Sequence, residues 1–267
     1  MTGDLIFRSI ILGISPPFGG RNDMSMAMNL SLPSLIGACT IVAISAVLQG
    51  SVGFGFSIVA APLLLLIDRR LVPGPLLLAG LVLIGFLTLR ERHSIDGSGL
   101  KWAFAGLLPG TLGGALILAT LPEPAMSLFF GGLVLLAVVM SVAGLHFAPT
   151  PPVLAGAGLL SGLMSATSSI SGPPIALVYQ HKPGASLRGT LSGYFLASTT
   201  FSILALRGVG HFGYEELTLA LPLLPAVLFG FWMSKWAIPV LDRGYTRPGV
   251  LILSSGAALI VIFRTIF

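Results

Sequence analysis

The chain has 267 residues, of which 55% are hydrophobic and only 9% are charged. Ordinary soluble domains contain about 25% charged residues, so this composition excludes a soluble globular fold. The net charge of +5 does not indicate nucleic-acid binding, because the basic residues lie in short loops beside apolar segments. The single cysteine, Cys39, excludes an intrachain disulfide and a Cys-x-x-Cys metal or redox motif.

Residues 1–32 are expected to lie outside the fold. Their apolar run, 5–14, is interrupted by Arg8 and lacks a small-residue cleavage site, so it is a poor match to a signal peptide. Three methionines further on are alternative start positions: Met24, Met26 and Met28. We interpret 1–32 as an N-terminal segment that is disordered or precedes the native start.

Eight uncharged apolar segments follow, most of them as long as the roughly 18 to 20 residues that a bilayer span requires. Four lie at 33–67, 71–89, 102–121 and 125–145, and four at 153–180, 189–206, 217–234 and 248–263. They predict an all-α polytopic membrane protein. The proline-rich stretch 148–152 is interpreted as a linker between a first transmembrane repeat, 33–147, and a second, 153–267.

Two markers occur in the same order in both sets of segments. Residues 50–62 and 162–174 each begin with Gly, end with Pro and are rich in small residues between. In the third segment of each set, the Leu-Leu-Pro sequence that begins 107–114 returns at 223–230. An internal duplication, common among transporters, explains both markers; chance similarity between apolar sequences is the alternative.

The first segment of each repeat is too long for one crossing. As a straight helix, 33–67 would extend about 50 Å, against a hydrocarbon core of about 30 Å. Each such segment has small residues at its middle and proline soon after, and these residues weaken or break helices. We expect two short half-helices that meet at a break near the bilayer midplane, where protein or a water-filled cavity satisfies the exposed backbone.

The basic residues bear on how the two halves are oriented. If each broken segment returns to its starting side, the halves are inverted, and Arg90 lies on the same side as Arg188 and Lys235, opposite Arg70 and Arg207. Eight simple crossings would instead place Arg90 with Arg207, on the side opposite the other three. We favour inversion.

The two break regions are the predicted site for a small anion. Unpaired N–H groups at half-helix N-termini attract anions, glycine permits close backbone approach, and hydroxyls are rotatable donors. Arg188, just before the next segment, is a candidate to attract or gate the anion. Close helix packing by small residues is the alternative role for these positions. The candidates are Gln49, Ser51, Gly53, Gly55 and Ser57 at the first break, Ser165, Thr167, Ser168, Ser169, Ser171 and Gly172 at the second, and Arg188.

An enzyme is not expected, because the many serines lack a His, Asp, Glu or Lys partner within the spans. No catalytic residue, metal site or cofactor is predicted. The spans also lack the carboxylate or histidine relay common in proton-driven carriers. This pattern favours an exporter or uniporter, since an inside-negative potential drives anions outward. A membrane scaffold or assembly factor without a solute path remains the alternative, and an intramembrane enzyme is a less favoured one.

At these residues the chain resembles the TauE/SafE sulfite exporter family. The resemblance lies in residues 48–63, with Gly-Phe-Gly-Phe at 53–56, in Ser-Gly-Pro-Pro at 171–174, and in Arg188, and it extends over about 35–263. Many members have a Gly-x-Gly-Gly-Gly run at the first break, which Phe54, Phe56 and Ser57 interrupt here. The resemblance implies a multi-pass protein of the cell membrane, in bacteria the inner membrane. It also implies transport of sulfite, a sulfonate or another organosulfur acid, with a homodimer left open.

Overall fold

The computed structural model describes residues 30–97, 99–142, 147–180 and 184–241. Within these ranges every regular element is a helix, and five helical stretches are long and apolar enough to cross a membrane. The predicted last segment, 248–263, and nearly all of the N-terminal segment 1–32 lie outside the described residues. The fold class predicted from the sequence, an all-α polytopic membrane protein, is confirmed.

The helices follow the predicted segments in order. The first set contains α3 (Leu32–Val52), α4 (Phe56–Ile67), α5 (Gly74–Glu91), α6 (Leu100–Thr120) and α7 (Glu123–Val142). The second contains α8 (Pro151–Ser168), α9 (Gly172–Tyr179), α10 (Gly184–Gly208), α11 (Tyr214–Ala220) and α12 (Leu224–Leu241). Three short 3-10 turns, η1 (Arg69–Leu71), η2 (Arg92–Ser94) and η3 (Leu221–Leu223), adjoin them.

Both overlong segments are broken, as the sequence predicts. Residues 53–55, the first break, separate α3 from α4, and residues 169–171, the second break, separate α8 from α9. The arms differ from the expected pair of short half-helices, because α3 has 21 residues and α4 only 12. At 1.5 Å per residue α3 is about 31 Å long. Helical geometry persists through Val52 because the left-handed conformation begins only at Gly53.

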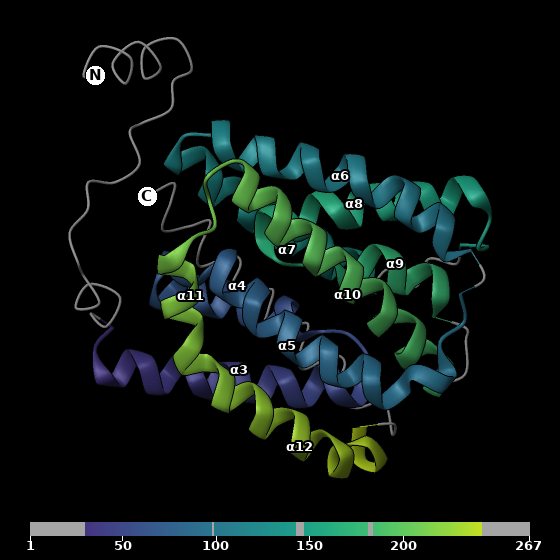
Figure 1. Cartoon of the computed structure of the whole chain (residues 1–267), viewed down its shortest axis with the longest axis horizontal. Helices are drawn as coiled ribbons and strands as arrows, with labels where there is room; N and C mark the ends of the chain where they lie inside the picture. Colours follow the sequence, from purple (N-terminus) through teal and green to yellow (C-terminus); the bar gives the residue numbers. More distant parts are fainter. Residues whose placement is uncertain (1–29, 98, 143–146, 181–183, 242–267) are drawn as a thin grey trace. The chain divides into compact units, whose positions relative to one another are not determined.

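The helices pack in a reciprocal pattern (Figure 1). α3 lies along α12, α8 lies along α6, and α5 lies along α10. The first segment of each predicted repeat therefore packs on the third segment of the other, while the second segments pack on each other. This exchange places both breaks against the central pair α5 and α10.

Glycines hold α6 and α8 at very short separation. A Cβ atom added to Gly106 would lie 1.9 Å from the carbonyl oxygen of Ala155, and one added to Gly158 would lie 2.0 Å from that of Ala103. Gly110 is equally close to the backbone of α8. Small residues that let backbones approach are the usual means of helix pairing in membranes, so these glycines serve the packing of α6 on α8.

The contacts of Arg90 and Arg188 bear on the orientation of the halves. The Nε atom of Arg188, near the start of α10, lies 3.6 Å from Oε1 of Glu91, at the end of α5. Arg90 also donates to the Ser234 hydroxyl of α12 at 3.0 Å, beside Lys235. Eight simple crossings would place Arg90 on the face opposite Arg188 and Lys235, whereas inversion places all three together. The structure has the grouping that inversion predicts.

Candidate functional site

The two breaks line one small cavity. Its volume is about 30 Å³, which is room for roughly two water-sized groups. None of the described residues that line it carries a charge. They are Gln49, Gly55, Phe56, Ser57 and Ile58 at the first break, Ser169, Ile170, Ser171 and Gly172 at the second, Leu76, Leu77, Gly80 and Ile84 of α5, and Phe195 and Thr199 of α10.

The cavity lies beside the middle of two membrane-length helices. Gly80 and Ile84 fall in the central part of the candidate span Arg69–Ser94, and Phe195 and Thr199 in that of Gly184–Gly208. Irregular backbone at such depth is tolerated only where protein or a cavity satisfies it. The position of the cavity is therefore the one expected for a break near the midplane of the spans.

The first break depends on glycine and on one glutamine. Gly53 and Gly55 have φ angles of 97° and 119°, a conformation that residues with a Cβ atom rarely adopt. The buried Gln49 side chain joins the two arms, because its Oε1 accepts from the Phe56 N–H at 3.0 Å and its Nε2 donates to the Gly53 carbonyl at 3.4 Å. Gln49 thus satisfies backbone groups that the break exposes.

The N-terminus of α4 opens toward the cavity. The helix ladder begins where the Val59 N–H donates to the Gly55 carbonyl at 3.2 Å. Ser57 and Ile58 precede that bond in the first turn, where N–H groups have no intrahelical acceptor. Both residues line the cavity, so the positive end of the helix dipole adjoins it.

The second break is built from serines instead. Ser169 has a φ angle of 62° and is the one non-glycine residue with positive φ in the described part of the chain. Its hydroxyl donates to the Pro73 carbonyl, near the start of α5, at 2.9 Å. The Ser161 hydroxyl of α8 donates to the Ser171 carbonyl at 2.7 Å. One contact from its own arm α8 and one contact to the residue before α5 therefore hold this break.

The start of α9 offers fewer donors than the start of α4. Its first three residues are Gly172, Pro173 and Pro174, and proline has no backbone N–H. The sequence led us to expect N–H groups from both half-helices. At the second break Pro173 and Pro174 have no N–H groups to offer. The backbone donors near the cavity therefore come mainly from α4.

The two breaks are in contact. A Cβ atom added to Gly172 would lie 3.6 Å from Cβ of Phe54 and 3.7 Å from the Phe195 ring. Segments more than a hundred residues apart in the chain therefore meet at one point. A change in the conformation of one break would therefore alter the packing of the other.

Six of the twelve predicted residues line the cavity, namely Gln49, Gly55, Ser57, Ser169, Ser171 and Gly172. The hydroxyls of three others donate to carbonyls of their own helices, namely Ser51 to Val47, Thr167 to Leu163, and Ser168 to Met164. Ser165 is bonded to the Ser202 hydroxyl of α10 at 2.8 Å. Gly53 and Arg188 pack against each other beside the cavity.

The sequence did not single out the residues that α5 and α10 contribute. Leucine and isoleucine in a span give no signal that separates a cavity wall from a lipid-facing surface, and Thr199 is one hydroxyl among several on α10. Gly80 packs against the Phe56 ring, 3.5 Å from the position its Cβ would take. A glycine in the middle of a span was the one available indication.

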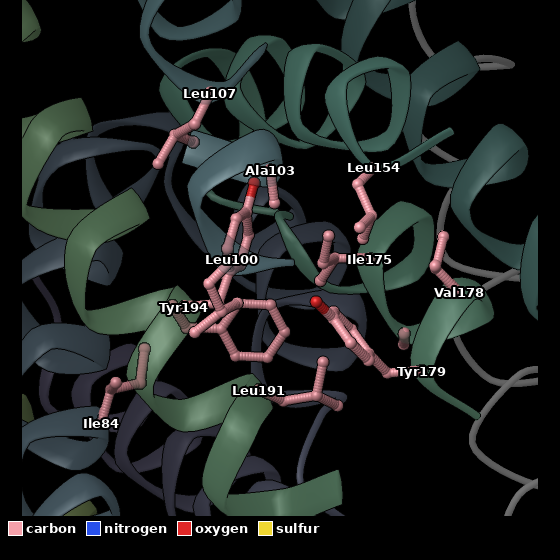
Figure 2. Close-up of a cluster of buried hydrophobic side chains, with 12 residues drawn as sticks. Ile84, Leu100, Ala103, Leu107, Leu154, Ile175, Val178, Tyr179, Leu191 and Tyr194 are labelled. Carbon is pink, nitrogen blue, oxygen red and sulfur yellow. The ribbon is translucent and has the colours of Figure 1, made fainter. Parts of the chain in front are cut away.

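Two tyrosines of the second repeat lie in the core. Tyr179 and Tyr194 belong to a cluster of buried side chains between α6, α8, α9 and α10 (Figure 2). The Tyr194 ring stacks on Phe104 with 5.7 Å between ring centroids. Neither tyrosine lines the cavity. They pack α9 and α10 against the neighbouring helices.

The chain matches the family described as sulfite exporter TauE/SafE over residues 20–261. No curated protein and no solved structure gives a significant match. The family match spans both predicted repeats and both breaks, which confirms the resemblance seen in the sequence. The chain therefore belongs to the sulfite exporter TauE/SafE family of membrane transporters.

Proposed function

We propose that this family member carries a small sulfur-containing anion, such as sulfite, a sulfonate or another organosulfur acid, through the cavity between its two breaks. The observation that carries the proposal is the shared cavity, because segments from both predicted repeats meet there beside the middle of α5 and α10. A membrane scaffold has no need of such a site. Reciprocal packing of the repeats also suits a carrier that alternates around a central site.

Uncharged groups would hold the anion. The N–H groups of Ser57 and Ile58 lie in the first turn of α4, at the positive end of the helix dipole and beside the cavity. The hydroxyls of Ser57 and Thr199 are rotatable donors. The Ser169 hydroxyl already donates its hydrogen bond to the Pro73 carbonyl, so toward the cavity it acts as an acceptor. Binding by dipoles rather than by a fixed cation lets the anion leave as readily as it enters.

The size of the cavity favours a compact solute. A volume of about 30 Å³ is small for an oxyanion of four heavy atoms, so side chains must move to admit one. Sulfite, with four heavy atoms, is smaller than any sulfonate and needs less widening of the cavity. The apolar walls, including Leu77 and Phe195, suit the short organic group of a small sulfonate and disfavour a second charge.

Outward movement of an anion needs no coupling ion. An inside-negative potential contributes about 2.3 kcal/mol per charge per 100 mV. We therefore propose an exporter or uniporter in the bacterial inner membrane. Symmetric uptake in the absence of a potential would favour the uniporter.

The test is the thermal stability of the purified protein in detergent with a panel of anions. The panel contains sulfite, sulfate, thiosulfate, sulfoacetate, taurine, acetate and phosphate. A ligand present at 100 times its dissociation constant stabilises the folded state by about 2.7 kcal/mol. We expect selective stabilisation by sulfite or a sulfonate; stabilisation by none of the panel would contradict the proposal.

A matched pair of variants places the site. Ser57 lines the cavity, whereas the hydroxyl of Ser51, at the same break, donates to a carbonyl of its own helix. Ser57→Ala should weaken anion binding roughly fivefold, the effect of losing a hydrogen bond of about 1 kcal/mol. Ser51→Ala should leave binding unchanged. Equal effects of the two substitutions would argue against the cavity as the binding site.

A further inference from the structure

Three charged side chains gather where α5 ends and α10 begins. The Nε atom of Arg90 donates to Oε1 of Glu91 at 3.1 Å. The Nε atom of Arg188 lies 3.6 Å from the same oxygen. The three side chains are 24%, 13% and 16% exposed, in the order Arg90, Glu91 and Arg188. One carboxylate oxygen therefore serves two largely buried guanidinium groups.

The charges of this cluster do not balance. Two guanidinium groups and one carboxylate leave one positive charge in excess among the three. Arg188 Nε is buried and has no hydrogen-bond partner among the described residues, and its distance to Glu91 is too long for a hydrogen bond. A partly buried charge without full compensation is costly. The geometry leaves Arg188 able to take another anion.

Arg90, in contrast, is fixed in place. Its guanidinium donates to the Gly50 carbonyl of α3 and to the Ser234 hydroxyl of α12, and it lies 5.5 Å from the Phe231 ring centroid. These contacts link three helices. Arg188 is therefore the member of the cluster that can exchange its partner, and Glu91 is the group it would exchange.

Arg188 adjoins the cavity through the first break. Its side chain packs against Gly53, since a Cβ atom added to Gly53 would lie 3.0 Å from Cγ of Arg188. The Gly53 carbonyl in turn accepts from the Gln49 amide, and Gln49 lines the cavity. Three consecutive contacts thus connect the guanidinium to the cavity.

We propose that Arg188 is a second anion site, outside the cavity, where the transported anion is held at one end of its path by displacing Glu91. The proposal rests on the function proposed above and adds a step to it. Glu91 occupies Arg188 when no anion is present and prevents the guanidinium from holding the anion too tightly. Arg90 retains Glu91 when the anion takes its place.

The experiment measures initial rates of sulfite transport in proteoliposomes over a range of sulfite concentrations and ionic strengths. Arg188→Gln should raise KM roughly tenfold or more, the loss expected for a charge-assisted hydrogen bond, with kcat changed much less. It should also weaken the increase of KM with salt that a charged site produces. Glu91→Gln should lower KM, because the competing carboxylate is removed.

Two further variants control for folding and for general loss of charge. Arg188→Lys keeps the charge and an alkyl stem against Gly53, so it should fall between wild type and Arg188→Gln. Arg70→Gln removes a guanidinium that pairs with Asp68 outside this cluster, and its KM should stay within about twofold of wild type. Each variant is compared at equal amounts of monodisperse protein.

Several results would overturn the second site. An unchanged KM and salt dependence in both Arg188 variants, with Ser57→Ala still impaired, would remove it while leaving the cavity function intact. A fall in kcat at constant KM in the Arg188 variants would mean that Arg188 only supports the structure of the first break and does not bind the anion. A raised KM in Glu91→Gln would contradict displacement. Both proposals would be overturned if the wild type did not transport sulfite and if no anion of the panel stabilised the purified protein.

Discussion

The two breaks occupy corresponding places in the predicted repeats but are held by different means. Gln49 spans the first break with its own side chain, and glycine provides the conformation. At the second break Ser169 bonds to Pro73 of the other half, and Ser161 supports Ser171. The side-chain support of the first break is therefore local, whereas the second break combines a local bond from α8 with a bond to Pro73, just before α5. At both breaks these polar side chains already make hydrogen bonds to backbone groups, so only their remaining donors and acceptors are available to a ligand.

The comparison also separates the two breaks by what they offer a solute. α4 begins with residues that have N–H groups, while α9 begins with two prolines among its first three residues. The first break can therefore donate to an anion through its backbone, and the second contributes mainly side-chain oxygens and rigid packing. We interpret the first break as the binding element and the second as the support.

The largest expected effect comes from removing glycine at the first break. Gly53→Ala forces a Cβ atom into a φ of 97° and to within 3.2 Å of Cα of Arg188. We expect the free energy of unfolding to fall by about 3 kcal/mol, since the costs of conformational strain and of crowding add. Denaturation of the purified protein in detergent measures it. Gly85→Ala, within α5 and with nothing inside 4 Å, is the control and should be neutral or slightly stabilising.

The next effect tests whether the first break is held locally. Gln49→Ala leaves the buried Phe56 N–H and Gly53 carbonyl without their partner, which should cost about 2 kcal/mol. The same unfolding measurement applies. Gln49→Glu can still accept from the Phe56 N–H but, when ionised, cannot donate to the Gly53 carbonyl. This variant should therefore also be less stable than the wild type. Full stability of Gln49→Ala would mean that packing alone holds the break.

The sequence was sufficient to predict the breaks but not their supports. Glycine, serine and proline in the middle of overlong segments identify both breaks, because these residues have known conformational effects. The partner of Ser169 could not be predicted, since it depends on how distant helices pack, and that of Ser161 depends on the local geometry of the break. Likewise, Ser51 and Ser57 look alike in sequence, and only the start of α4 decides which one faces the cavity. The pairing of Arg188 with Glu91 also requires the fold.

A smaller effect tests the serine-based second break. Ser169→Ala keeps a Cβ atom at φ 62° and removes the bond to the Pro73 carbonyl, whereas Ser169→Gly removes the bond but relieves the conformation. We expect Ser169→Gly to be the more stable variant by about 1 kcal/mol. This order reverses the usual preference for alanine in helices. If alanine were the more stable replacement, the left-handed conformation at this position would be in doubt.

The smallest effect concerns how the short arm of each break ends. α9 ends at Tyr179 within a buried apolar cluster, whereas α4 ends at Ile67 and is capped by Asp68. The Asp68 carboxylate accepts from the Arg70 N–H at 2.8 Å and from the Arg70 guanidinium at 2.7 Å. Burial tends to raise the pKa of Asp68, but these hydrogen bonds and the Arg70 charge outweigh it, so the pKa lies below its ordinary value of 3.8.

A lowered folded-state pKa means that the ionised form stabilises the folded protein above the unfolded pKa, and that this contribution is lost as the pH falls through the folded pKa. Because the pair is partly exposed, the gain should be under about 1 kcal/mol. The difference in melting temperature between wild type and Asp68→Asn should therefore be small at pH 7, begin to shrink near the unfolded pKa of about 4, and disappear only below the folded pKa. A difference that persists in acid would show that the amide changes packing at the end of α4, and that the two short arms are anchored more alike than their chemistry indicates.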